Sequence, residues 1–172
     1  SPRISQRMLF AFTCVGLTAT LARADESGPP PVEKYLIEGD LAAGHAAMEE
    51  RIKSSPDDQQ ARFSLGVVQF LEAIETLAQS QYRHGLLQTR LRQMPFLRMP
   101  VPPNEDPETI TYESARKNLQ TFVDNLGVAE ATLARVQPDG IKLPLHFGRI
   151  RLDLDGNGTA TEQETLWRLY QI

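Results

Sequence analysis

A run of oxygen-bearing side chains occurs at alternate positions near the carboxyl end of the sequence. The run begins at Asp153 and closes at Glu164, and a glycine, Gly158, lies near its middle. Side-chain oxygens at alternate positions converge on one point when the chain winds around it, and hard divalent cations prefer oxygen ligands. We therefore expect a metal site formed by six residues: Asp153, Asp155, Asn157, Thr159, Thr161 and Glu164.

This spacing resembles the 12-residue calcium loop of EF-hand proteins, with Asp153 at the first position and Glu164 at the last. The resemblance implies side-chain oxygens from the two aspartates and the asparagine. It also implies a carbonyl oxygen from Thr159, a hydroxyl or bridging water from Thr161, and a bidentate carboxylate from Glu164. Gly158 supplies the tight turn. The implied ion is Ca²⁺, because a bidentate glutamate suits it better than Mg²⁺ and the loop holds no His or Cys for zinc.

Two features set this loop apart from the usual EF-hand. Ala160 stands where most EF-hands have a larger aliphatic residue that bridges to a second loop, and the sequence shows no second loop. The site is therefore either solitary or paired with the loop of a second copy, as a homodimer. We expect a short entering helix from 144 to 152, an exiting helix from 162 to 172, and weak affinity, about 10⁻⁴–10⁻³ M as in extracellular modules.

The other residues that could do chemistry are isolated from one another. His45 lies on an apolar stripe, which is typical of a hydrogen-bonded core or boundary histidine, and His84 lies at the basic end of a helix. His146 is expected to face solvent. No serine, cysteine or carboxylate motif accompanies any of them, so we do not expect an enzyme.

Three apolar patterns predict the helices that position the loop. A helix is expected from 41 to 54 with Asp40 as its N-cap, and another begins after Asp57 and Asp58. A long helix from 108 to 136 is capped by Thr111. The second helix is apolar on two faces, which predicts a central position. Its two stripes are Phe63, Val67, Phe70, Ile74 and Leu77, and Leu65, Val68 and Leu71.

The first two helices resemble a tetratricopeptide hairpin over about residues 40–86. Leu65, Gly66, Ala78 and Tyr82 stand at positions typical of that repeat, whereas other positions depart from it and no third repeat is visible. The resemblance implies a protein-interaction module and hence a protein partner. A Pro-rich crossover from 94 to 107 follows, and its Phe96, Leu97 and Val101 are expected to pack over the helices.

The amino-terminal residues 1–24 have the pattern of a signal peptide. Arg3 and Arg7 precede an apolar run from Met8 to Leu21, and Ala22-Arg23-Ala24 resembles a cleavage site. We therefore expect cleavage after Ala24 and a secreted or periplasmic protein. The run is shorter than the ~20 residues of a membrane-spanning helix, so no membrane association is expected after cleavage. Residues 25–32, which include three consecutive prolines, are expected to form an extended leader.

Composition narrows the function classes. The 172 residues include 18 Lys and Arg and 22 Asp and Glu, which give a net charge of −4. Residues 1–24 contain three Arg and no acid, so the remainder has 15 basic and 22 acidic residues and a charge of −7. This acidity disfavours nucleic acid and suits a cation. The single Cys excludes a disulfide scaffold and a cysteine-ligated zinc site.

Together these patterns predict an all-α protein, a helical bundle or helical-hairpin domain from 33 to 140 followed by a single EF-hand from 141 to 172. The expected function is calcium binding in an exported helical protein, with a structural or weak sensor role. The alternative is a periplasmic interaction module on the tetratricopeptide-like scaffold, with calcium incidental.

Overall fold

The computed structural model describes residues 31–86, 99–137 and 139–169, so the expected signal peptide, most of the expected leader and part of the Pro-rich crossover lie outside the described residues. The all-α prediction is confirmed for the described part, whose other backbone pairing is an isolated bridge between Arg151 and Thr165. No described helix combines the length and hydropathy needed to cross a bilayer. The elements are α1 (Glu33–Glu38), α2 (Leu41–Ser54), α3 (Gln59–Arg83), α4 (Tyr112–Leu133), the 3₁₀ helix η3 (Phe147–Arg149) and α5 (Leu166–Leu169).

The predicted caps determine where the long helices begin. Asp40 accepts a hydrogen bond from the Ala43 N–H at 2.9 Å, and α2 has the bounds predicted for it. Asp58 likewise caps α3 by accepting from the Ala61 N–H at 2.8 Å. Thr111 begins α4 through a reciprocal capping box, so this helix is shorter than the predicted 108–136.

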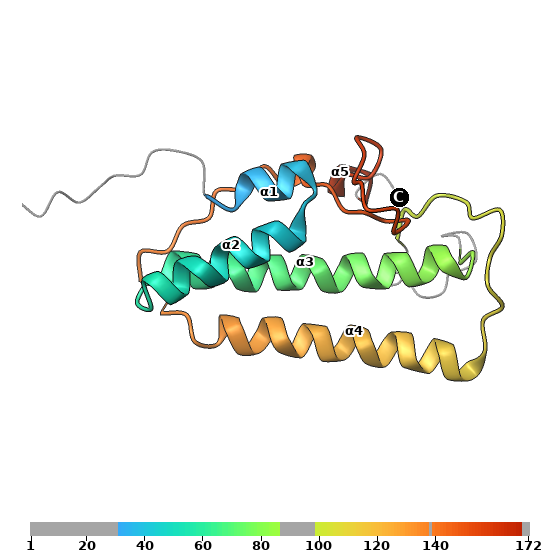
Figure 1. The fold of residues 1–172 in the computed structure, drawn as a ribbon, viewed down its shortest axis with the longest axis horizontal. Helices are drawn as coiled ribbons and strands as arrows, with labels where there is room; N and C mark the ends of the chain where they lie inside the picture. The colour runs from blue at the N-terminus through green and yellow to red at the C-terminus, as the bar shows by residue number, and fades with distance from the viewer. Residues whose placement is uncertain (1–30, 87–98, 138, 170–172) are drawn as a thin grey trace, which may run out of the picture.

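The helices form three layers with α3 in the middle (Figure 1). α4 runs antiparallel to α3 along one side, whereas α1, α2 and the carboxyl-terminal segment cover the other side (Figure 1). The central position predicted for the second helix is therefore confirmed.

The main apolar core lies between α3 and the layer formed by α1, α2 and the carboxyl-terminal segment. Val101, from the Pro-rich crossover, is buried there as expected, whereas Phe96 and Leu97 lie outside the described residues. The buried members of this core are Val32, Leu36, Leu41, Met48, Leu65, Val68, Leu71, Ala78, Met99, Val101, Ile150, Leu152, Leu154 and Leu166.

One member of the predicted α3 stripes is not in the core. Phe70 is 45% exposed. At 100° per residue, it lies between the side of α3 that carries Leu71 into the core and the side that carries Gly66 against α4. The prediction that Phe70 is buried is therefore wrong, because the two covered sides leave an open strip between them.

The predicted helix from 144 to 152 is also wrong. Only η3 forms there, and Ile150, Leu152 and Leu154 then alternate between buried and less buried positions in an extended segment. Alternation with period two is the burial pattern of an extended chain. Its backbone bonds the core on both sides, because the Arg151 N–H donates to Leu36 O and the Leu152 N–H donates to Glu164 O, both at 2.9 Å.

The exiting helix begins later than predicted. Residues 162 and 163 form a turn, and α5 covers Leu166–Leu169, with residues 170–172 outside the described part. The Leu166 N–H donates to Ile150 O at 2.9 Å and its side chain is buried, so the start of α5 is held against the entering segment.

The contact between α3 and α4 relies on small residues. A Cβ built on Gly66 would lie 2.5 Å from Leu133 Cδ2, so the absence of a side chain lets α4 approach closely. Ala129 is buried in the same interface. A second, smaller apolar cluster joins Leu77 of α3 to Phe122 of α4.

We predict opposite effects for the same substitution at two helical glycines. Gly66→Ala should lower the free energy of unfolding by about 1–3 kcal/mol, because the new methyl group collides with Leu133. Gly127→Ala, on α4 with nothing within 4 Å of the new Cβ, should raise it by about 0.5–1 kcal/mol. Urea unfolding followed by circular dichroism measures both changes. Equal effects of the two substitutions would contradict the close approach of α3 and α4.

A buried acid joins α1 to the segment before the loop. The Glu33 carboxylate is 4% exposed, accepts a hydrogen bond from the His146 N–H at 3.1 Å, and lies 2.6 Å from His146 Nδ1. The His146 ring remains largely exposed, as expected for this residue. Its hydrogen bond to the carboxylate lowers the pKa of Glu33, although burial of the carboxylate acts in the opposite direction.

This lowered pKa predicts an acid-sensitive contact. A carboxyl group with a lowered pKa stabilises the folded state above its ordinary pKa, and the stabilisation is lost as the pH falls through the lowered value. Glu33→Gln should therefore be less stable than the parent at about pH 7, with a smaller difference at about pH 3. Urea midpoints at both pH values test this, with the exposed Glu38→Gln as the matched control. A pH-independent effect of Glu33→Gln would contradict the assignment.

Candidate metal centre

The segment from Asp153 to Glu164 leaves the core and returns to it as a closed loop. Two glycines in the loop have positive φ angles, Gly156 at 76° and Gly158 at 84°. Residues with a Cβ rarely adopt this conformation, so glycine is required at both bends. The turn predicted at Gly158 is confirmed.

Three carboxylates of the loop converge. Ligand oxygens of Asp153, Asp155 and Glu164 all lie within 4.8 Å of one another, and in the described part of the chain this is the one group of three such residues. Glu164 is buried, whereas the two aspartates are partly exposed. The first, third and last of the predicted ligand positions are therefore brought together.

Backbone amides of the loop turn toward the first aspartate. Asp153 Oδ1 accepts from the N–H groups of Gly156 and Asn157 at 2.9 and 3.1 Å, and Oδ2 accepts from the Gly158 N–H at 2.8 Å. These bonds wind the chain around the Asp153 carboxylate. They also supply partial positive charge beside it, which reduces the cost of holding a second and a third acid nearby.

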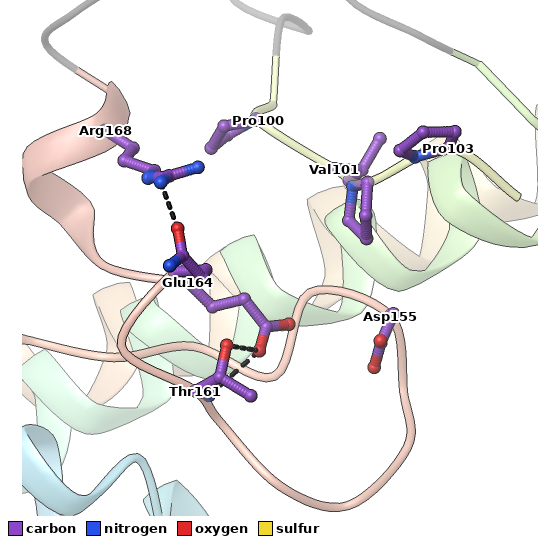
Figure 2. Close-up of a pocket in the computed structure, with 9 residues that line it drawn as sticks. Pro100, Val101, Pro103, Asp155, Thr161, Glu164 and Arg168 are labelled. Carbon is purple, nitrogen blue, oxygen red and sulfur yellow. Dashed lines mark hydrogen bonds between the residues drawn. The ribbon is translucent and has the colours of Figure 1, made fainter.

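Glu164 closes the loop from the other end. Its Oε1 accepts from the Leu154 N–H at 2.9 Å, and its Oε2 accepts from the N–H and hydroxyl of Thr161 at 2.9 and 2.7 Å. Figure 2 shows Thr161 and Glu164 bonded in this way, with Asp155 on the opposite arm of the loop. Thr161 thus lies beside the acids, as predicted, and its hydroxyl orients one of them.

Asn157 and Thr159 lie at the edge of the cluster. Asn157 Nδ2 donates to Asp155 Oδ2 at 2.9 Å, while its Oδ1 accepts from the Thr159 N–H at 2.8 Å. Both residues are exposed. The structure thus joins Asn157 to the acids through its amide nitrogen and joins Thr159 only through Asn157, which differs from the oxygen ligation expected of them.

Helix α3 holds the start of the loop in place. Glu75 Oε2 accepts from the Asp153 N–H at 2.7 Å, and Gln79 Nε2 donates to the Asp153 carbonyl at 2.8 Å. Sequence reasoning missed both residues. The available signal was the spacing of two polar side chains four residues apart, which places them on one face of an otherwise apolar helix.

The crowding of acids raises two pKa values. Burial is the main cause for Asp155, and the charges of Glu164 and Asp153 add to it. Burial also raises the pKa of Glu75 to about 7, with Asp153, Glu72 and Glu164 as neighbouring negative charges. The site therefore has excess negative charge that a cation would relieve.

A cleft of about 530 Å³ opens beside the acids. The Pro-rich segment from Pro100 to Pro103 forms one wall, and Asp155, Thr161, Gln163, Glu164 and Arg168 line the remainder (Figure 2). Arg168 is bonded to Gln163 and remains near the rim. The crossover thus contributes to the surroundings of the loop as well as to the core.

Ala160, at the eighth loop position, packs within its own chain. It is buried, and a Cβ built on Gly39 would lie only 2.2 Å from Ala160 Cβ. Gly39 has a φ of 79° and ends α1. The turn between α1 and α2 therefore covers the position through which EF-hands usually contact a second loop.

None of the three histidines belongs to the carboxylate cluster. His45 is bonded to Glu72, which confirms the prediction of a hydrogen-bonded boundary histidine, and His84 caps the end of α3. His146 bonds Glu33 in the segment before the loop.

The geometry of the loop is accordingly the main guide to function. Its three acids converge, its closing glutamate is buried, and its two bends require glycine. No protein-family model, curated protein or solved structure matches the chain.

Proposed function

We propose that this protein binds one Ca²⁺ ion in the loop from Asp153 to Glu164, as a solitary EF-hand. The observation that carries the proposal is the convergence of the Asp153, Asp155 and Glu164 oxygens within 4.8 Å. Three acids at this separation repel one another, and a divalent cation converts that repulsion into attraction.

The donor set favours calcium over other divalent ions. The converging ligands of the described residues are all carboxylate oxygens, which are hard donors, whereas zinc prefers nitrogen and sulfur. Glu164 offers two oxygens at the closing position, and calcium accepts bidentate carboxylates and irregular shells more readily than magnesium does. Rotation of the Asn157 amide by 180° would turn its oxygen toward Asp155 and add a neutral ligand.

The position of the loop supports a structural or weak sensor role. Glu164 lies two residues before the buried Leu166, and Asp153 is held by Glu75 and Gln79 of α3. An ion that joins Asp153 to Glu164 would therefore fasten the final segment to the central helix. Residues 1–24 complete the proposal as an export signal, which would place the protein outside the cytoplasm, where calcium is plentiful.

The alternative function has its own observation. Phe70 on α3 and Tyr112, Leu119 and Val123 on α4 are exposed large apolar side chains, with Tyr112 81% exposed. Such residues favour contact with a protein partner. In that case the helical scaffold would be the interaction module and calcium would be incidental.

Calcium titration of the full chain tests the first proposal. We expect saturable heat with a dissociation constant of about 10⁻⁴–10⁻³ M. We also expect unfolding to become harder by roughly 1.4 kcal/mol at about ten times that concentration. Glu164→Gln and Asp155→Asn should each abolish or greatly weaken both effects, because each removes a negative charge from the converging group.

Two controls make this experiment decisive. Asp57→Asn alters an exposed acid at the turn between α2 and α3 and should titrate like the parent. Asp155 is partly exposed, so Asp155→Asn should fold even if Glu164→Gln does not. If the loop variants bind calcium as the parent does, or if calcium and a chelator leave the parent equally stable, the loop is not a calcium site.

The packing of Ala160 predicts that the loop acts alone and not as half of a homodimer. Ala160→Ile restores the kind of residue that paired EF-hands carry, but here the larger side chain must displace Gly39. We expect it to lower the free energy of unfolding by about 1–3 kcal/mol. Analytical ultracentrifugation should show the parent as a monomer with or without calcium, and a calcium-dependent dimer would contradict a solitary loop.

A further inference from the structure

A second cleft lies at the opposite edge of α3 from Phe70, between α2 and α4. It has a volume of about 410 Å³, and its lining differs from that of the cleft beside the loop. The wall carries carboxylate, amide, hydroxyl and imidazole groups beside three aliphatic residues. The lining residues are Leu41, Ala42, His45, Gln69, Glu72, Glu75, Thr76, Asn125 and Val128.

One carboxylate of this cleft is held in a fixed orientation. His45 Nδ1 lies 3.0 and 2.9 Å from the two oxygens of Glu72, and His45 Nε2 lies 3.6 Å from Glu49. The imidazole therefore bridges two acids on different helices. A carboxylate held in this way presents its remaining lone pairs in a defined direction.

A buried amide in the same wall lacks a partner. Gln69 is 8% exposed, and its Oε1 has no hydrogen-bond partner and no contact with solvent in the described structure. An unsatisfied buried acceptor typically costs about 1–3 kcal/mol. Its presence in the wall of a cleft points to a hydrogen-bond donor that the protein itself does not supply.

The chemistry of the wall identifies the class of ligand. Glu72 and Glu75 bring negative charge, and no lysine or arginine lines the cleft. The groups that await a partner are acceptors, so the ligand must be a donor and a cation. Leu41 and Val128 offer aliphatic surface for a hydrocarbon chain.

A metal ion fits this cleft less well than an organic cation. Among the described residues, the ligand atoms of His45, Glu72 and Glu75 do not form a convergent group of the kind found in the loop. A cleft of about 410 Å³ also holds many more atoms than a single ion does. The acceptors are therefore spaced for a molecule with an extended body.

We propose that this cleft binds a small aliphatic amine. Its ammonium group would donate to the carboxylates of Glu72 and Glu75, Gln69 would accept a further hydrogen bond, and the methylene groups would lie against Leu41 and Val128. This site does not depend on calcium binding in the loop.

The test uses n-butylamine as its hydrochloride, with butan-1-ol as a neutral ligand of the same shape, and follows amide chemical shifts of the full chain. Butylammonium should shift residues of α2, α3 and α4 around the cleft saturably, and butanol should not. Glu72→Gln and Gln69→Leu should each weaken binding about tenfold, because each removes an acceptor for a charged donor. Glu50→Gln, at an exposed position of α2, should leave the affinity unchanged.

Several results would overturn the proposal. Absence of saturable shifts, equal shifts with butanol, or unaltered affinity in both cleft variants would exclude an amine site. If Gln69→Leu is more stable than the parent and binds the amine equally well, the cleft holds water only. If zinc chloride binds the parent but not Glu72→Gln, and the amine does not bind, the cleft is a metal site.

The outcome is separable from that of the calcium proposal. Asp155→Asn should still bind butylammonium, and Glu72→Gln should still bind calcium, because neither substitution alters a residue assigned to the other site.

Discussion

The mutual repulsion of three carboxylates is the constraint on which the carboxyl-terminal half of this structure depends. Unit charges about 5 Å apart repel by roughly 1 kcal/mol in bulk water and by several times that near a protein surface. The chain answers with N–H groups, three directed at Asp153 and others at Glu164. Gly156 and Gly158 permit the bends that aim those amides. The loop is therefore organised around negative charge before any ion is considered.

The same constraint explains why α3 carries polar residues in its middle. The loop must be anchored to something rigid, and Glu75 and Gln79 anchor the backbone on either side of the Asp153 Cα. The anchor has an electrostatic cost, because Glu75 is a fourth acid beside the cluster and its pKa rises to about 7 on burial. The edge of α3 that serves the loop continues into the wall of the second cleft through Glu75 and Glu72. One helix thus supports the apolar core, the loop and a polar cleft on different sides.

Local signals in the sequence predicted the parts of the structure that are decided locally. Asp40, Asp58 and Thr111 determine where helices begin because a cap acts over three residues. The acids of the loop were found because their spacing is a property of one short segment. The extended run at Ile150 was mistaken for a helix, since its alternation has meaning only against a core supplied by distant residues. Glu75 was missed for the same reason, because it contacts a backbone group 78 residues away.

The contact between Gly39 and Ala160 has a consequence for how the molecule assembles. It joins residues from the two ends of the described chain, and contacts between distant residues form slowly because a long loop has to close first. The helical hairpin of α2 and α3 can form early from neighbouring residues, whereas the acids gather only after the amino-terminal turn has docked. A peptide cut down to the loop alone would lack both that turn and α3. The acidic loop is thus a late product of folding, completed by the chain that was made first.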